Sequence, residues 1–150
     1  MRGLIAGLIM AALSGLQTYA QDSGWGDLDA LLLSTLSPAG QMEAAFWMPD
    51  SADPIAARVA LAVAYVSPEG INTPASINIH AGVYEKRSQG WVQTHPVRGL
   101  FGTSPRDVLY VGDRIEVTMT VPGPNDPRCC PTETARFSIL RTTGDALRTR

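Results

Sequence analysis

Residues 114–121 read Arg-Ile-Glu-Val-Thr-Met-Thr-Val, and this run decides the fold more clearly than any other part of the chain. Apolar side chains at 115, 117, 119 and 121 alternate with polar ones, as in a β-strand with one face in the core and one in water. The run 135–139, Ala-Arg-Phe-Ser-Ile, alternates in the same way. We expect the two runs to pair in an antiparallel sheet, joined by a loop that contains both cysteines.

A further strand is predicted at Val59–Tyr65, where large and small apolar residues alternate instead of apolar and polar ones. Both faces of such a strand are apolar, so both should be covered. Upstream, the leucines at 28, 31, 32 and 36 recur at the spacing of one helical face, and Asp27 can cap the helix that they form. We expect this helix to cover the alanine face of the strand.

The remaining patterns extend the β-structure. Strands are expected at 43–48, 76–84 and 91–95, separated by turns rich in proline, glycine and charged residues. In the second of these, His80 and Tyr84 should point away from the core. The polar tail, Thr142–Arg150, is expected to fray. The expected fold is therefore mainly β (α+β), a single antiparallel sheet or small sandwich of about six strands with one N-terminal helix packed on it.

The first twenty residues have the pattern of a cleaved secretory signal. Arg2 provides a positive start, residues 3–13 form an apolar segment of signal-peptide length, and Thr18-Tyr-Ala20 supplies small residues where a signal peptidase reads. A membrane anchor is the alternative, but polar residues interrupt the run before the ~20 positions that a span needs. We expect a signal peptide at 1–20 and a single secreted β-rich domain at 21–150, periplasmic or secreted after cleavage near Ala20, without a membrane anchor.

The charge of the chain argues against a nucleic-acid partner. The formal net charge is −2, and it becomes −3 once Arg2, the only charged residue of the leader, is removed. A weakly acidic protein with scattered arginines has no basic patch for a phosphate backbone. Nucleophile elbows, P-loops, zinc-protease motifs and dinucleotide fingerprints are also missing from the sequence. We therefore expect a non-enzymatic domain that needs no cofactor and acts on a protein or small-molecule partner in the periplasm.

The cysteines are adjacent and lie in the proline-rich run Pro122-Gly-Pro-Asn-Asp-Pro-Arg-Cys-Cys-Pro131. Four prolines fix φ along this loop and lower its conformational entropy, so the loop should be stiff. Asn125 and Asp126 can bond neighbouring backbone amides through their side chains. The candidate binding or structural site comprises Asn125, Asp126, Pro127, Arg128, Cys129, Cys130 and Pro131.

Three chemical states of the cysteine pair compete. The first is a bridge between Cys129 and Cys130, which is strained because adjacent Cα atoms lie ~3.8 Å apart, below the usual disulfide range of roughly 4.4–6.8 Å. The second is a pair of reduced thiols packed as small hydrophobes. The third is metal ligation or pairing with another molecule. A bridge between neighbours closes almost no chain, so its role would be to fix the loop shape.

The run Asp126-Pro-Arg-Cys-Cys-Pro131, followed by an aromatic strand at Arg136-Phe137, resembles the C-terminal motif of small exported bacterial proteins that include the LppP/LprE lipoprotein group. The resemblance covers about the last forty residues and includes Val111-Gly-Asp-Arg-Ile115. It implies a secreted domain with a β-rich body, no assigned activity and no catalytic residues. The chain departs from that group in lacking a lipidation cysteine after the apolar leader.

The alternative function is that of a thiol-dependent redox or soft-metal-handling protein. His80 and His95 could join the two cysteines, with Met119, in a site suited to Cu(I) or Zn²⁺. The spacings Cys-x-x-Cys and His-x-x-x-His, which would support such a site, do not occur. A thiol-redox enzyme usually carries Cys-x-x-Cys at the start of a helix, whereas these cysteines precede a strand. We expect both histidines to be solvated, and no metal site.

Overall fold

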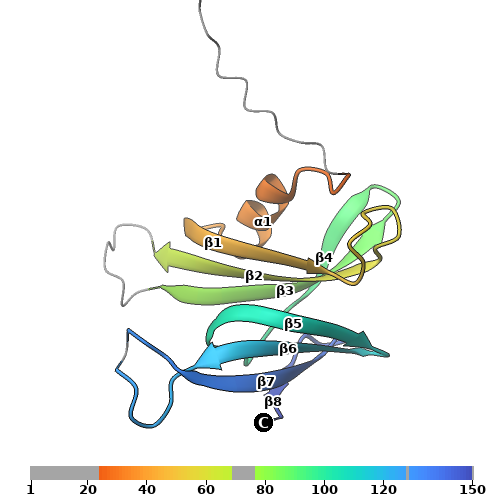
Figure 1. Ribbon diagram of the computed structural model, residues 1–150. Helices are drawn as coiled ribbons and strands as arrows, with labels where there is room; N and C mark the ends of the chain where they lie inside the picture. Colours follow the sequence, from red (N-terminus) through yellow and green to blue (C-terminus); the bar gives the residue numbers. More distant parts are fainter. Residues whose placement is uncertain (1–23, 69–76, 128, 150) are drawn as a thin grey trace, which may run out of the picture.

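The computed structural model describes residues 24–68, 77–127 and 129–149, and they form two four-stranded antiparallel sheets packed face to face (Figure 1). Each sheet is a simple meander, in which strands adjacent in sequence are adjacent in space. The first sheet contains β1 (Gly40–Pro49), β2 (Val59–Pro68), β3 (Asn78–Arg87) and β4 (Gly90–Pro96). The second contains β5 (Thr103–Val111), β6 (Arg114–Val121), β7 (Glu133–Leu140) and β8 (Ala146–Arg148). The expectation of a small sandwich is confirmed.

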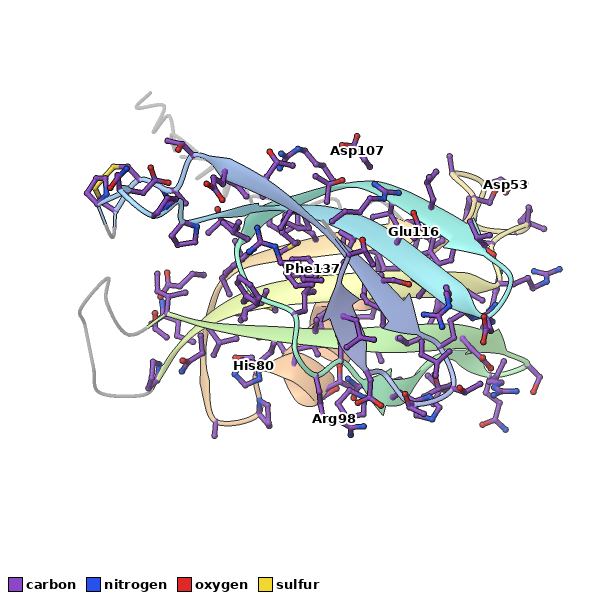
Figure 2. All side chains as sticks on the ribbon, turned by 90° about the horizontal axis from the view of Figure 1, so that it is seen from below. Asp53, His80, Arg98, Asp107, Glu116 and Phe137 are labelled. Carbon is purple, nitrogen blue, oxygen red and sulfur yellow. A yellow bond between two sulfur atoms is a disulfide. The ribbon has the colours of Figure 1, made fainter. Side chains whose placement is uncertain are left out.

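The main core lies between the two sheets and is built from the alternating strands. Val117 and Met119 of β6 are fully buried, and so is Phe137 of β7, which lies opposite Val117 in the register (Figure 2). Leu61 and Val63 of β2 are also fully buried and close the core from the other sheet. Burial of such side chains stabilises the fold by roughly 1.5–3 kcal/mol each.

The single helix of the described residues, α1 (Leu28–Leu36), covers the outer face of the first sheet (Figure 1). Asp27 caps it, since its carboxylate accepts a hydrogen bond of 3.0 Å from the amide of Ala30. Leu32 and Leu36 pack on the alanine face of β2, as expected from the sequence. The small alanines leave room for the helix to approach the sheet closely. The helix is too short to cross a membrane.

A cluster of aromatic rings extends this second core beside the helix. Trp47 lies in contact with Trp91 at a centroid distance of 5.0 Å and with Tyr84 at 5.4 Å. Tyr84 points away from the main core, as predicted, yet it is fully buried because the helix covers it. Its hydroxyl lies 2.6 Å from that of Thr35 on α1. The tryptophans therefore serve the packing of the helix on the sheet.

Two strands were missing from the sequence prediction, which gave about six strands where the described residues form eight. Strand β5 loses its alternation because its register with β6 shifts twice and Ser104 and Asp107 adopt positive φ angles of 52° and 51°. The prediction that the tail 142–150 frays is wrong for its middle part. There β8 pairs with β7, and Ala146 is buried in the main core. Three residues are too few for a periodic signal.

Two tyrosines connect the sheets in opposite directions. Tyr65 of β2 donates a hydrogen bond of 3.1 Å to the carbonyl oxygen of Gly102, just before β5. Tyr110 of β5 accepts a hydrogen bond of 2.8 Å from the amide of Leu61 and donates one to the carbonyl oxygen of Met48. Burial raises the pKa of Tyr65 to about 12, so its hydroxyl remains a donor at neutral pH. These bonds fix the separation of the sheets near the open edges of β1 and β5.

Candidate functional site

The cysteine loop projects from one end of the sandwich, between β6 and β7 (Figures 1 and 2). Asp126 holds its base. One carboxylate oxygen of Asp126 accepts hydrogen bonds of 2.7 Å from the amides of both Gly123 and Thr132, and the Thr132 hydroxyl also lies within 3.0 Å of the carboxylate. The prediction that Asp126 satisfies local amides is confirmed. These hydrogen bonds lower the pKa of the Asp126 carboxyl, and the bond from the Gly123 amide has the largest effect.

The sulfur atoms of Cys129 and Cys130 lie at disulfide distance, with Cα atoms 3.8 Å apart. This arrangement corresponds to the first of the three states considered above, the bridge between neighbours. The amide of Cys130 donates a hydrogen bond of 3.0 Å to the carbonyl oxygen of Pro127, which closes a turn that ends at Cys130. Both cysteines are exposed. Arg128, also a predicted site residue, lies outside the described residues.

Beside the loop, the ends of the two sheets enclose an open groove of about 850 Å³, which we call the aromatic groove. Cys129 and Pro131 form its wall on the loop side, whereas Asn125, Asp126 and Pro127 do not line it. The groove therefore joins part of the predicted site to strand residues that the sequence did not single out. Its described lining consists of Glu43, Ala44, Phe46, Tyr65, Ile77, Ile79, Phe101, Gly102, Thr103, Ser104, Thr120, Pro122, Cys129 and Pro131.

Large apolar side chains stand partly in solvent along this groove. Phe46 is 37% exposed, and Ile77 and Phe101 are each 44% exposed. The ring of Phe46 meets that of Tyr65 edge to face at a centroid distance of 6.1 Å, while Phe101 packs against the core residue Phe137 at 5.0 Å. Each of the two phenylalanine rings thus packs against another ring on one side and is exposed to solvent on another. Phe46 reads as an ordinary inward strand residue, so the sequence carries no signal for this exposure.

A β-bulge shapes one wall of the groove. The pairing of β1 with β2 shifts between Met42, which lies opposite Val66, and Ala44, which lies opposite Tyr65, so Glu43 is the extra residue. A bulge of this kind turns two consecutive side chains toward the same face and is common beside binding sites. Glu43 and Ala44 accordingly both line the groove. The Ser67 hydroxyl donates a hydrogen bond of 2.7 Å to Oε1 of Glu43 and orients the carboxylate.

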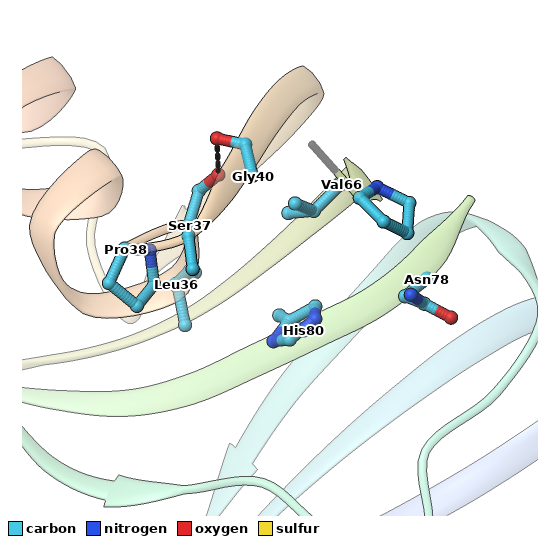
Figure 3. Close-up of a pocket in the computed structure, with 9 residues that line it drawn as sticks. Leu36, Ser37, Pro38, Gly40, Val66, Asn78 and His80 are labelled. Carbon is cyan, nitrogen blue, oxygen red and sulfur yellow. Dashed lines mark hydrogen bonds between the residues drawn. The ribbon is translucent and has the colours of Figure 1, made fainter. Parts of the chain in front are cut away.

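The two histidines lie apart from the aromatic groove. His80 is exposed and lines a smaller hollow of about 180 Å³ between the end of α1 and strands β2 and β3 (Figure 3). There Ser37 donates a hydrogen bond of 2.9 Å to the carbonyl oxygen of Gly40. His95 is half-buried on β4, against the expectation of a solvated side chain, and Met119 is enclosed in the core. Within the described parts of the chain, no three His, Cys, Asp or Glu residues are grouped as metal ligands.

Comparison with models of protein families, with curated proteins and with solved structures gives no match for this chain.

Proposed function

We propose that the protein is an exported, non-enzymatic binding module that takes a small molecule with a mainly apolar body into the aromatic groove. The observation that carries the proposal is the groove itself, an opening of about 850 Å³ whose walls come from both sheets and from the cysteine loop. Sites for small ligands usually have volumes of about 300–1,000 Å³, with mainly apolar walls and a few polar groups that orient the ligand. The groove has this composition.

The wall residues suggest how such a ligand would be held. Phe46, Phe101 and Ile77 offer exposed apolar surface, which water covers when the groove is empty. Transfer of a ligand from water to this surface is favourable in proportion to the apolar area that becomes buried. Thr103 and Ser104 belong to the same lining and offer hydroxyl groups that can orient a polar group of the ligand.

The cysteine loop contributes a preformed wall in this proposal. Asp126 holds the loop base, and the Cys129–Cys130 pair restrains its tip. A wall that is fixed before binding costs less conformational entropy than one that must be ordered by the ligand. The loop thus acts as the structural clamp that the sequence suggested.

Export supports this use of the loop, because disulfides persist in oxidising compartments such as the periplasm. The assignment rests on the signal-like residues 1–20 and on the resemblance of the run Asp126–Pro131 to exported bacterial proteins. Residues 1–20 lie outside the described part of the chain. A periplasmic small molecule is therefore the proposed partner, and the β-rich body is its scaffold.

Titration of the purified protein with the neutral fluorescent dye N-phenyl-1-naphthylamine tests the proposal. We expect saturable binding with an increase in dye emission. Phe46→Ala and Ile77→Ala should weaken it, because each removes apolar wall surface. Leu147→Ala and Ile55→Ala are matched controls, since these side chains are 66% and 78% exposed and do not line the groove. Absence of saturable binding, or equal weakening by the control variants, would overturn the proposal.

A further inference from the structure

Glu43 is the only charged residue in the described lining of the aromatic groove. The bulge in β1 sets its position. In a regular strand, side chains alternate between the two faces, so Ala44 would face the groove and Glu43 would face away from it. The Ser67 hydroxyl occupies Oε1 of Glu43 and holds the carboxylate in place. Glu43 is exposed, so its second carboxylate oxygen can meet a ligand in the groove.

The aromatic rings of the groove, like the Glu43 carboxylate, attract a positively charged ligand. The face of an aromatic ring carries partial negative charge and attracts a cation, whereas it repels an anion. Phe46, Tyr65 and Phe101 lie on the lining with Glu43, and no Lys, Arg or His of the described residues does. The Arg106 guanidinium approaches the lining from behind, since it donates hydrogen bonds to the Ser104 carbonyl oxygen and to the Thr120 hydroxyl, but Arg106 does not itself line the groove. Among the described lining residues, an anionic ligand would meet only the negative charge of Glu43. A cationic ligand would meet attraction from both kinds of wall.

We infer that the natural ligand is a small organic ammonium ion, with a protonated or quaternary nitrogen attached to an apolar body. The nitrogen lies beside Glu43 and the body lies along Phe46, Phe101 and Ile77. This inference rests on the proposed function of the groove and adds the charge class of its ligand. It predicts discrimination between ligands of equal shape, which an apolar groove alone would not provide.

Three naphthalene derivatives test the inference by displacing the neutral dye. These are 1-naphthylmethylamine, which is cationic at neutral pH, 1-naphthylmethanol, which is neutral, and 1-naphthoate, which is anionic. We expect the amine to bind roughly three- to tenfold more tightly than the alcohol, and the naphthoate to bind most weakly. The preference for the amine should shrink as sodium chloride is added, because salt screens a charge pair near the surface.

The decisive variant is Glu43→Gln, which keeps an acceptor for Ser67 but removes the charge. It should bind the amine no better than the alcohol and bind the neutral dye as the unmodified protein does. Asp113→Asn in the β5–β6 turn is the charge-matched control and should keep the preference. If the dye binds and the amine has no advantage, or if its advantage survives Glu43→Gln, the charge inference is wrong while the binding function stands. If the dye itself does not bind, the proposed function fails, and the inference fails with it.

Discussion

Tyr65 reaches across the sandwich to Gly102, with 3.1 Å between its hydroxyl and the Gly102 carbonyl oxygen. The same tyrosine lines the aromatic groove and touches Phe46, so one residue both joins the sheets and shapes the groove. Gly102 is required at the far end of this bond. Its φ is +108°, and an added Cβ would lie 2.6 Å from the Thr120 carbonyl oxygen.

Tyr65→Phe should destabilise the fold by about 0.5–1.5 kcal/mol, because it removes the hydrogen bond to Gly102 but keeps the ring. Urea unfolding followed by tryptophan fluorescence measures the change. The neutral dye should still bind, since the apolar wall is preserved. A variant as stable as the original protein would show that the bond between Tyr65 and Gly102 makes no net contribution to the free energy of unfolding.

Met119→Asp should prevent folding or lower stability severely. Met119 is fully buried between the sheets, and an aspartate there would lack any group to pair its charge. Circular dichroism and thermal melting measure the loss. Leu147→Asp is the control at a site 66% exposed, and its melting temperature should change little. A cooperative melt at the original temperature for the Met119 variant would contradict the core described above.

The double variant Cys129→Ser/Cys130→Ser should stay folded, with a modest drop in melting temperature. A ring between neighbouring residues closes almost no chain, and the main core lies between the sheets instead of in the loop. The affinity for the neutral dye should fall even where the melting temperature changes little, because Cys129 lines the groove. If the variant is unfolded at room temperature, the cysteines organise the core and the clamp interpretation is wrong.

Acidification should release the loop base only below the pH range in which an ordinary aspartate takes up its proton. The pKa of Asp126 is lowered from its ordinary value of 3.8 by hydrogen bonds that need the ionised form. Its contribution to stability is therefore present above pH 3.8 and is lost as the pH falls through the lowered pKa. Nuclear magnetic resonance of the Gly123 and Thr132 amides should show a transition with a midpoint below pH 3.8. In Asp126→Asn this transition should disappear; a midpoint above the ordinary value would refute the pKa direction.

Intact mass of the exported protein should correspond to a chain that begins at Gln21, with or without cyclisation to pyroglutamate. The pattern Thr18-Tyr-Ala20 is the basis of this expectation. Alkylation before and after reduction reports the state of the cysteines: a bridged pair gains two labels only after reduction. Retention of Met1 in a membrane fraction would contradict cleavage, and labelling without reductant would contradict the bridge.

The sequence predicted those elements in which one periodic pattern decides the fold. Strand β6 was foreseen because its four alternate apolar residues are all buried, although Thr118 on the polar face is buried as well. Strand β2 was foreseen because both of its faces are apolar, and both are buried. The pattern fails where the backbone leaves the regular pleat, as at Ser104 in β5 and at the bulge of Glu43 in β1. The aromatic groove escaped prediction for a further reason. It depends on how the ends of the sheets are spaced, which the composition of single strands does not encode.

The irregular backbone of β5 also bears on edge-to-edge association between copies of the chain. An exposed apolar groove beside a free sheet edge invites copies of a chain to join edge to edge and grow into fibrils. Along β5, the left-handed residues Ser104 and Asp107 interrupt the row of amides and carbonyls that another strand would need. The distortion at this edge therefore opposes the pairing of another chain with β5 beside the apolar groove.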